Sequence, residues 1–204
     1  RNLLYLAYIF SLLENNKQRF IFTSVLQNAS KMYKYRTDGK GGIVTGTLYI
    51  PALNQENNIA NLLQNKAEMI YKAAVNYKGP DCIVSTNSST QEPMPDNSID
   101  YIFTDPPFGA NINYSELSFL WEAWLKIVTD SKQEAICNSI QHKGLPEYQE
   151  LMTQCFTEFN RILKPNHWMT VEFHNSKNSV WNAIQEALLR AGFVIADVRT
   201  LDKK

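Results

Sequence analysis

The residues best suited to chemistry are Asp105, Pro106, Pro107 and Phe108, in which a carboxylate, two prolines and an aromatic ring follow one another. Two consecutive prolines stiffen a turn and remove two backbone donors, so we expect the carbonyl groups there to face outward as unpaired acceptors. The ring of Phe108 could stack on a planar heterocycle. The Asp105 carboxylate and the Pro106 carbonyl could accept the two hydrogens of its exocyclic amine.

Such acceptors would also activate the amine. The lone pair of an aniline-like amine is delocalised into the ring, which makes the nitrogen a poor nucleophile. Two acceptors can pull the amine toward a tetrahedral geometry and favour the positive charge that develops in the transition state, which is electrostatic preorganisation. No nucleophilic cysteine is needed for this chemistry.

The elements that must position this turn follow from the spacing of apolar residues. A strand over 98–104, which we expect to be buried, ends directly at Asp105. In open α/β sheets, ligands bind beyond the carboxyl ends of the strands. Further strands are expected at 45–50, 82–85, 167–173 and 193–198, and helices at 3–14, 17–32, 56–75, 117–128, 151–163 and 181–191, the last capped by Gly192.

This alternation predicts an α/β fold with a mainly parallel sheet and helices on both faces. The helix over 3–14 is apolar nearly all round, so we expect it to be buried. Trp121 and Trp124 lie three residues apart on an apolar helix face, where core packing is the better interpretation.

The sequence around the turn resembles a known family. The segments Asp100–Trp124 (DYIFTDPPFGANINYSELSFLWEAW), Arg161–Trp168 (RILKPNHW) and Val171–His174 (VEFH) are similar to bacterial adenine-specific DNA methyltransferases that use S-adenosylmethionine. The close resemblance covers about residues 80–202, and Gly46–Pro51 (GTLYIP) is the recognisable part before it. It implies a Rossmann-like class I methyltransferase fold and methyl transfer to the exocyclic amine of a flipped DNA base.

The resemblance also implies site residues. The first residue of the turn is Asp rather than Ser, which favours adenine N6 over cytosine N4 as the target. Phe108 replaces the commoner Tyr and keeps the stacking face without the hydroxyl. By family position, Thr104 and Asp105 would approach the methionine end of the cofactor, and the loop containing Ser85 and Asn87 would lie near its adenine.

One family feature is missing from the sequence. The family holds its cofactor with a glycine-rich turn after the first strand, and none of the eight glycines here forms such a motif. We therefore expect the first two strands to lie upstream of Arg1. The chain would then be a fragment, incomplete at its N-terminal side, that holds the base-binding half of the active site and could be inactive by itself.

Several other residues could contact DNA. Asn111 and Tyr114 could shape the base pocket, or they could serve loop packing and capping beside Ser115, which is a candidate N-cap. The basic and aromatic segment 31–42, with Lys34 and Arg36, could follow a DNA backbone and stack on a base. A solvated loop anchored by its tyrosines is the alternative. The polar loop 129–146 could be a lid over DNA or a plain surface loop.

The composition of the chain excludes several classes of protein. The chain has 204 residues, 44% of them hydrophobic, and a net charge of zero, which exclude a disordered or collagen-like chain. The longest apolar stretch, Leu3–Leu13, is too short to span a bilayer, so we expect no membrane association. Residues 1–40 carry a net charge of +5 and residues 41–204 of −5, which allows a local basic patch.

Cysteine and histidine usage points to a reduced, cytoplasmic and metal-free protein. Neither the three cysteines nor the three histidines have the spacing of a metal site or a disulfide framework. We expect two parts, a helical and loop segment at 1–78 and a catalytic core half at 79–204.

Three functional alternatives stay open. The acceptor could be RNA or a protein amide nitrogen in place of DNA, or the domain could be a non-catalytic nucleic-acid-binding module. Restriction or defence partners and the oligomeric state are not determined by the sequence.

Overall fold

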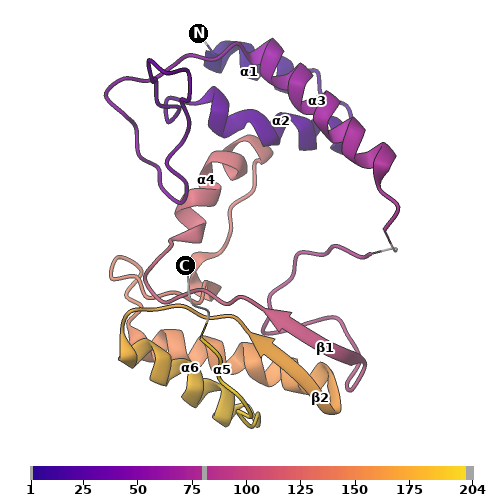
Figure 1. The fold of residues 1–204 in the computed structure, drawn as a ribbon, viewed down its shortest axis with the longest axis vertical. Helices are drawn as coiled ribbons and strands as arrows, with labels where there is room; N and C mark the ends of the chain where they lie inside the picture. Colours follow the sequence, from indigo (N-terminus) through magenta and orange to yellow (C-terminus); the bar gives the residue numbers. More distant parts are fainter. Residues whose placement is uncertain (1, 80–81, 201–204) are drawn as a thin grey trace. The chain divides into compact units, whose positions relative to one another are not determined.

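The computed structural model describes residues 2–79 and 82–200, and its contacts divide the chain into two units (Figure 1). The first unit comprises the chain up to Ile83 together with Glu116–Thr129, and the second comprises Val84–Ser115 and the chain from Asp130 onward. Helix α4 (Tyr114–Leu125) therefore begins in the second unit and continues in the first.

The first unit is built from helices α1 (Asn2–Ser11), α2 (Asn16–Ala29) and α3 (Ile59–Asn76) with most of α4. Helix α2 begins with a reciprocal cap, in which the side chain of Asn15 accepts from the Gln18 N–H and Gln18 accepts from the Asn15 N–H. The core of this unit consists of buried residues from three helices or their ends: Leu6, Phe22, Leu26, Ala29 and Ile59.

Aromatic rings join α4 to this core. Trp124 lies 5.2 Å from Phe22 and 5.5 Å from Phe10, measured between ring centroids. The indole N–H of Trp121 donates to the Thr23 carbonyl at 3.0 Å, which satisfies the polar atom of a largely apolar side chain. The expectation that Trp121 and Trp124 are core residues is confirmed.

The prediction that the first helix is buried is wrong. Of the residues of α1, Leu6 is buried, whereas Leu3 is 69% exposed and Tyr8 62% exposed. The helix contacts α2 and α3, and the side chains that face away from both have no covering element in the described part of the unit. An all-round apolar sequence therefore did not produce all-round burial.

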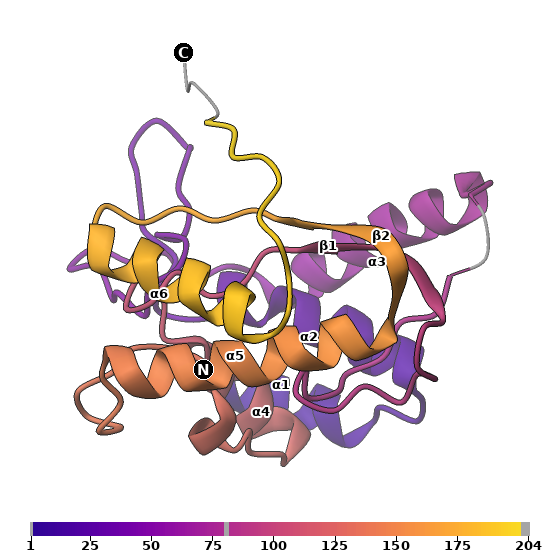
Figure 2. The ribbon, with the colours of Figure 1, turned by 90° about the horizontal axis from the view of Figure 1, so that it is seen from below.

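The second unit holds a two-stranded parallel sheet, β1 (Ile99–Thr104) beside β2 (Leu163–Val171). Helices α5 (Leu145–Ile162) and α6 (Asn178–Arg190) lie side by side along one face of the strands (Figure 2), and a short 3-10 helix, η1 (Ser131–Gln133), precedes α5. This arrangement is a mixed helix–strand fold compatible with the α/β class. Its core consists of Tyr148, Met152, Phe156, Val180, Ile184, Ala187 and Ala191.

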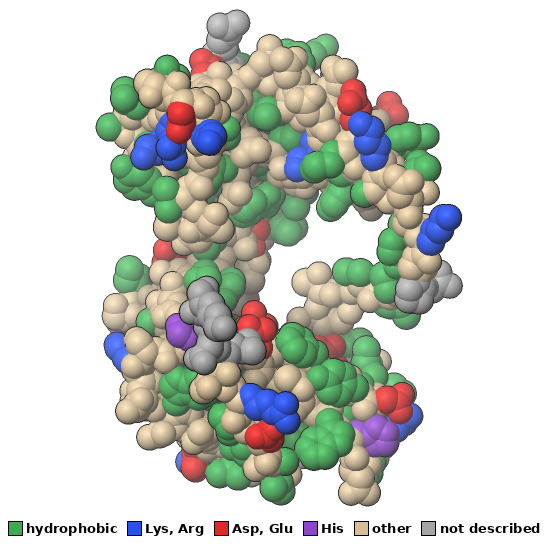
Figure 3. Space-filling view, viewed as in Figure 1, with side chains coloured by type: hydrophobic (Ala, Val, Ile, Leu, Met, Phe, Trp, Pro, Cys, Tyr) green, Lys and Arg blue, Asp and Glu red, His purple; other side chains and the backbone are tan. Residues whose placement is uncertain are grey.

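The two faces of this sheet differ in how far their side chains are buried. Met169 and Val171 of β2 pack against the α5–α6 core. Tyr101, Phe103 and Trp168 are 53%, 61% and 66% exposed, and Figure 3 shows hydrophobic side chains gathered over the strands. The strand before the Asp-Pro-Pro-Phe turn is thus correctly located by the sequence, but the expectation that it is buried is wrong, since helices cover one face only in the described part of the unit.

Three other predicted strands are also wrong. The segment 45–50 contains a turn at Gly46, whose φ is +72°, and the segments 82–85 and 193–198 have no regular structure. Ile83 is 97% exposed and Val194 87%. An apolar run becomes a strand only where a neighbouring strand takes its backbone hydrogen bonds, and no described strand pairs with these segments.

The predicted strand 167–173 begins earlier, at Leu163. The Lys164–Asn166 segment, between the predicted helix and the predicted strand, lies inside β2 as an irregularity, because Ile99 pairs with Leu163 and Tyr101 with Trp168. Asn166 adopts a left-handed φ of 62° there. The extra residues of a bulge accommodate Pro165, which has no N–H to contribute to the sheet.

One polar network aligns the start of β1 with the end of α5. The Arg161 guanidinium donates to Glu158 at 2.7 Å and to the Glu92 carbonyl at 3.1 Å, and it also pairs with Asp96. The backbone N–H groups of Asn97 and Ser98 donate to the carbonyls of Arg161 and Ile162. Because β2 follows α5 directly, this network sets where β1 begins beside it.

None of the described helices combines the length and apolar character needed to cross a membrane.

The Glu158–Arg161 pair should make stability dependent on acid pH. The hydrogen bond from Arg161 lowers the pKa of Glu158 from 4.5 to about 2. Since the folded-state pKa is depressed, this stabilisation is complete above pH 4.5 and is lost as the pH falls toward 2. We expect the melting temperature of Glu158→Gln to vary less with pH over this window than that of the parent. Glu186→Gln, at an exposed carboxylate paired with Arg190, is the matched control; equal slopes for all three proteins would contradict the prediction.

Candidate functional site

The Asp-Pro-Pro-Phe turn leaves the sheet at the carboxyl end of β1, as the sequence predicts. Thr104 is the last residue of the strand, and its carbonyl accepts from the Glu172 N–H at 2.9 Å. From Asp105 the chain leaves the ladder and crosses to the start of α4 at Tyr114. The turn therefore lies at the edge of the sheet where ligands bind in α/β folds.

Three successive carbonyl groups at this turn are held by donors from three different segments. The Tyr148 hydroxyl of α5 donates to the Pro107 carbonyl at 2.5 Å, and the Asn175 amide donates to the Phe108 carbonyl at 2.9 Å. The Cys137 N–H donates to the Gly109 carbonyl at 3.2 Å. The expectation that the carbonyls here are unpaired is therefore wrong for these three residues.

The Pro106 carbonyl is different, because it accepts no hydrogen bond from residues 2–79 or 82–200. Pro106 is buried, and the adjacent Asp105 is exposed. The Asp105 carboxylate likewise has no hydrogen bond or ion pair within those ranges. The two oxygens that the sequence singled out as amine acceptors thus have no partner among the described residues, whereas the three carbonyls that follow them are bound.

The Asp105 carboxylate also acts on Tyr114, at the start of α4. Burial raises the pKa of Tyr114, and the negative charges of Asp105 and Glu134 raise it further. The Tyr114 hydroxyl therefore stays protonated and can serve as a donor near Asp105. Asn111, between the two, is exposed and makes no hydrogen bond with the described residues.

The ring of Phe108 is half-buried and held by edge contacts. Its centroid lies 5.3 Å from that of Phe173, with the planes at 87°, and 6.4 Å from that of His174. Phe173 in turn meets Trp181 of α6 at 5.1 Å. These contacts connect Phe108 to the end of β2 and to α6, so its ring plane is set by neighbours and does not rotate freely.

The loop between α4 and α5 is anchored to the turn region. Glu134 caps the start of α4, accepting from the N–H of Ser115 at 2.9 Å and from its hydroxyl at 2.7 Å. Burial acts to raise the pKa of Glu134, but the hydrogen bonds from Ser115 and Gln141 outweigh it and hold the pKa below its ordinary value. Ile136 of the same loop is fully buried. The capping group is therefore Glu134, and the expectation that Ser115 is the N-cap is wrong.

The structure does not bring all the proposed site residues together. Ser85 and Asn87 lie in an exposed segment and bond to each other at 3.1 Å, with no hydrogen bond to Thr104 or Asp105. Lys34 and Arg36 belong to the first unit. Lys34 bridges to Gly42 and Asn54 through its backbone, and the Arg36 guanidinium pairs with Asp38 at 2.6 Å.

Sequence reasoning missed Tyr148 as a residue of this site. Tyr148, Met152 and Phe156 recur every four residues on the buried face of α5, and all three are core residues. A tyrosine on such a face needs a partner for its hydroxyl, and this requirement is the signal that could have identified it. Burial raises the pKa of Tyr148 well above its ordinary value, so the hydroxyl remains a donor.

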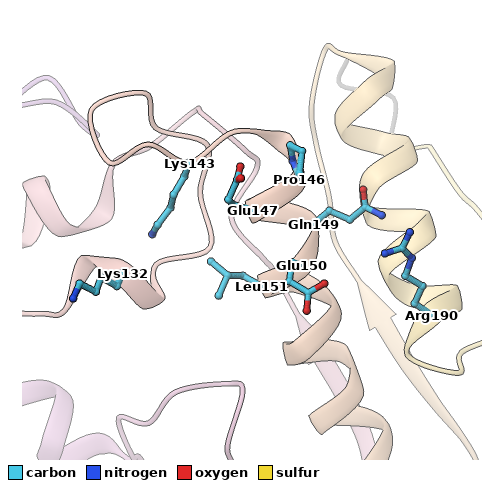
Figure 4. Close-up of a pocket in the computed structure, with 8 residues that line it drawn as sticks. All are labelled: Lys132, Lys143, Pro146, Glu147, Gln149, Glu150, Leu151 and Arg190. Carbon is cyan, nitrogen blue, oxygen red and sulfur yellow. The ribbon is translucent and has the colours of Figure 1, made fainter.

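A separate pocket of about 670 Å³ lies between the loop, α5 and α6 (Figure 4). Its polar groups are largely used already. The Lys143 ammonium donates to the Ser131 and Glu134 carbonyls, Glu147 accepts from the Gly144 N–H, and Arg190 pairs with Glu186. No residue of the Asp-Pro-Pro-Phe turn lines this pocket.

No protein-family model, curated protein or solved structure matches the chain. The functional argument therefore depends on the geometry of the turn and its supports.

Gly109 is the backbone position on which the turn geometry depends most directly. Its φ is +70°, and a Cβ would lie 3.3 Å from Cγ1 of Val180. We expect Gly109→Ala to lower the free energy of unfolding by about 1–2 kcal/mol from the left-handed backbone alone, with a further loss from the contact, as measured by urea denaturation.

Gly192→Ala is the matched control for Gly109→Ala in the same unit. Its φ is also positive, but the nearest atom is the terminal amide of Asn160, which can rotate away. A loss at Gly192 equal to or greater than the loss at Gly109 would contradict the role of the Val180 contact.

Proposed function

We propose that the protein is an S-adenosylmethionine-dependent DNA methyltransferase that methylates the exocyclic amine of a flipped base, of adenine N6 type. One observation carries this proposal. At the end of β1, an exposed carboxylate on Asp105 and a Pro106 carbonyl that no described residue binds stand next to the oriented ring of Phe108. An aromatic amine is the ligand that uses both oxygen acceptors and an aromatic face.

The chain's own residues would bind and orient the base. Asp105 and Pro106 would each accept one hydrogen of the amine, which directs the nitrogen lone pair out of the plane of the ring. Phe108 would stack on the base, and a flipped base is extruded from the duplex at a cost of a few kcal/mol. The carboxylate would favour the positive charge that develops on the nitrogen, since it is already in place before reaction.

The described residues fit the base better than they fit the cofactor. Bound S-adenosylmethionine would supply an electrophilic methyl group. The left-handed glycines of the described chain are Gly39, Gly46, Gly109 and Gly192, and none forms the glycine-rich strand–helix turn that cradles this cofactor. Ser85 and Asn87 are not joined to Thr104 or Asp105 in the structure. We therefore assign these residues to base binding and derive no step through the cofactor.

The finer fold assignment belongs to the same proposal. In the second unit the chain runs from β1 to β2 by way of α5, and the two strands are parallel neighbours. A parallel pair with helices on its connection is the repeating unit of a Rossmann-like class I methyltransferase fold. The proposal places the protein in the cytoplasm with DNA as its partner.

A non-catalytic nucleic-acid-binding module is the second candidate. The absence of a glycine-rich cofactor turn from residues 1–204 favours it. RNA and protein amide nitrogens are alternative acceptors for the same turn, since both present a planar nitrogen.

Removing the Asp105 carboxylate should separate catalysis from binding. We expect Asp105→Ala, in the complete protein, to abolish methyl transfer to DNA while leaving DNA affinity within a few-fold, because one acceptor of the amine is lost. Methyl incorporation and a DNA-binding titration measure the two effects. Asp100→Ala, at an exposed carboxylate in β1, the strand that precedes Asp105, is the matched control and should keep full activity. Unchanged turnover in Asp105→Ala would remove Asp105 from the mechanism.

Cofactor affinity separates the two candidate functions. We expect calorimetry of this 204-residue chain with S-adenosylmethionine to show weak or no binding, because the glycine-rich turn is missing. The complete protein should bind the cofactor if it is an enzyme. Tight binding by the chain alone would show that we have misplaced the cofactor site, and no binding by the complete protein would favour the non-catalytic module.

A further inference from the structure

Three of the five carbonyls from Asp105 to Gly109 are held by donors from other segments. Those of Pro107, Phe108 and Gly109 are bound, and those of Asp105 and Pro106 accept no hydrogen bond from the described residues. Prolines contribute no N–H, so the turn cannot satisfy its carbonyls from within. External donors therefore decide which carbonyls of the turn remain available.

We propose that Asn175 is a positioning residue for the methyl-transfer reaction, which fixes the Phe108 ring and the Pro106 carbonyl relative to the base amine. This inference rests on the proposed function. Asn175 lies just beyond β2, and its Nδ2 donates to the Phe108 carbonyl at 2.9 Å. It does not touch the base, and it acts through the backbone of the residue that does.

The orientation of the Asn175 side chain is set from both ends. Its Oδ1 accepts from the Lys177 N–H at 2.8 Å, at the start of α6, so Nδ2 must face Phe108. Its own backbone carbonyl accepts from the indole N–H of Trp181 at 2.8 Å. Because each polar atom has one partner, the amide cannot flip without losing two hydrogen bonds.

Gly109 brings the backbone of the turn close to this contact. A Cβ on Gly109 would lie in ordinary van der Waals contact with Nδ2 of Asn175, at 3.6 Å, and closer, at 3.3 Å, to Cγ1 of Val180. Phe173, two residues before Asn175, meets the Phe108 ring edge to face. The end of β2 thus holds Phe108 by both its backbone and its ring.

The role can be tested by comparing two substitutions of Asn175 in the complete protein. Asn175→Asp keeps the oxygen that accepts from Lys177 but places a second oxygen against the Phe108 carbonyl, which repels it. Asn175→Ala loses both hydrogen bonds without the repulsion. We expect kcat to fall in both, by about 10²-fold in Asn175→Asp and by less in Asn175→Ala, with the KM for DNA unchanged.

A merely structural role predicts the opposite order. If Asn175 only supports the start of α6, Asp should replace it well, since a carboxylate near a helix N-terminus is favourable, and Ala should be the worse variant. Asn178→Asp makes the same change three residues away, at the first residue of α6, and should leave kcat unchanged.

Tyr148→Phe provides an independent check if Asn175→Asp does not fold. It removes the donor to the Pro107 carbonyl and keeps the ring in the core. We expect kcat to fall while the KM for DNA is unchanged. If the parent is active and Asn175→Asp keeps full kcat, this inference alone is overturned. If Asn175→Asp does not fold, full kcat in Tyr148→Phe has the same consequence. A complete protein that transfers no methyl group would overturn the proposed function and this inference with it.

Discussion

The turn that follows β1 contains two consecutive prolines and obtains the hydrogen bonds to its carbonyls from other segments, and this constraint organises the second unit. Neither Pro106 nor Pro107 has an N–H, and Gly109 adopts a left-handed conformation that only a residue without a Cβ accepts easily. The hydroxyl of Tyr148 and the amide of Asn175 then supply donors from α5 and from the end of β2. A buried hydrogen bond contributes about 1 kcal/mol to the free energy of folding. The greater effect of these two bonds is to fix the orientation of the Pro107 and Phe108 carbonyls.

The turn can be fixed only if β1 itself is placed correctly. Two parallel strands have no hairpin to set their register, so the register must be set from outside the pair. Arg161 does this at the start of β1, where it joins the end of α5 to Glu92 and Asp96. The bulge around Pro165 then accommodates the extra residues of β2, so that Thr104, the last residue of β1, pairs with Val171.

The polarity of the turn is consistent with a binding role. A buried carboxylate without a partner is strongly unfavourable, and Asp105 avoids that penalty because it is exposed. The Pro106 carbonyl belongs to a buried residue and accepts no hydrogen bond from the described residues. Tyr114 remains a neutral donor in the field of Asp105 and Glu134. The site therefore offers acceptors and a donor that the fold has not used itself.

Sequence alone predicted the helices well and the strand before the turn correctly, because helical periodicity and the Asp-Pro-Pro-Phe motif are local. It could also place Gly192 as a cap and Trp121 in a core. It failed at 82–85 and 193–198, because a strand requires a partner that no local pattern contains. Only the tertiary structure decided which carbonyls of the turn are bound, since the donors Tyr148 and Asn175 lie 41 and 67 residues from the carbonyls they bind.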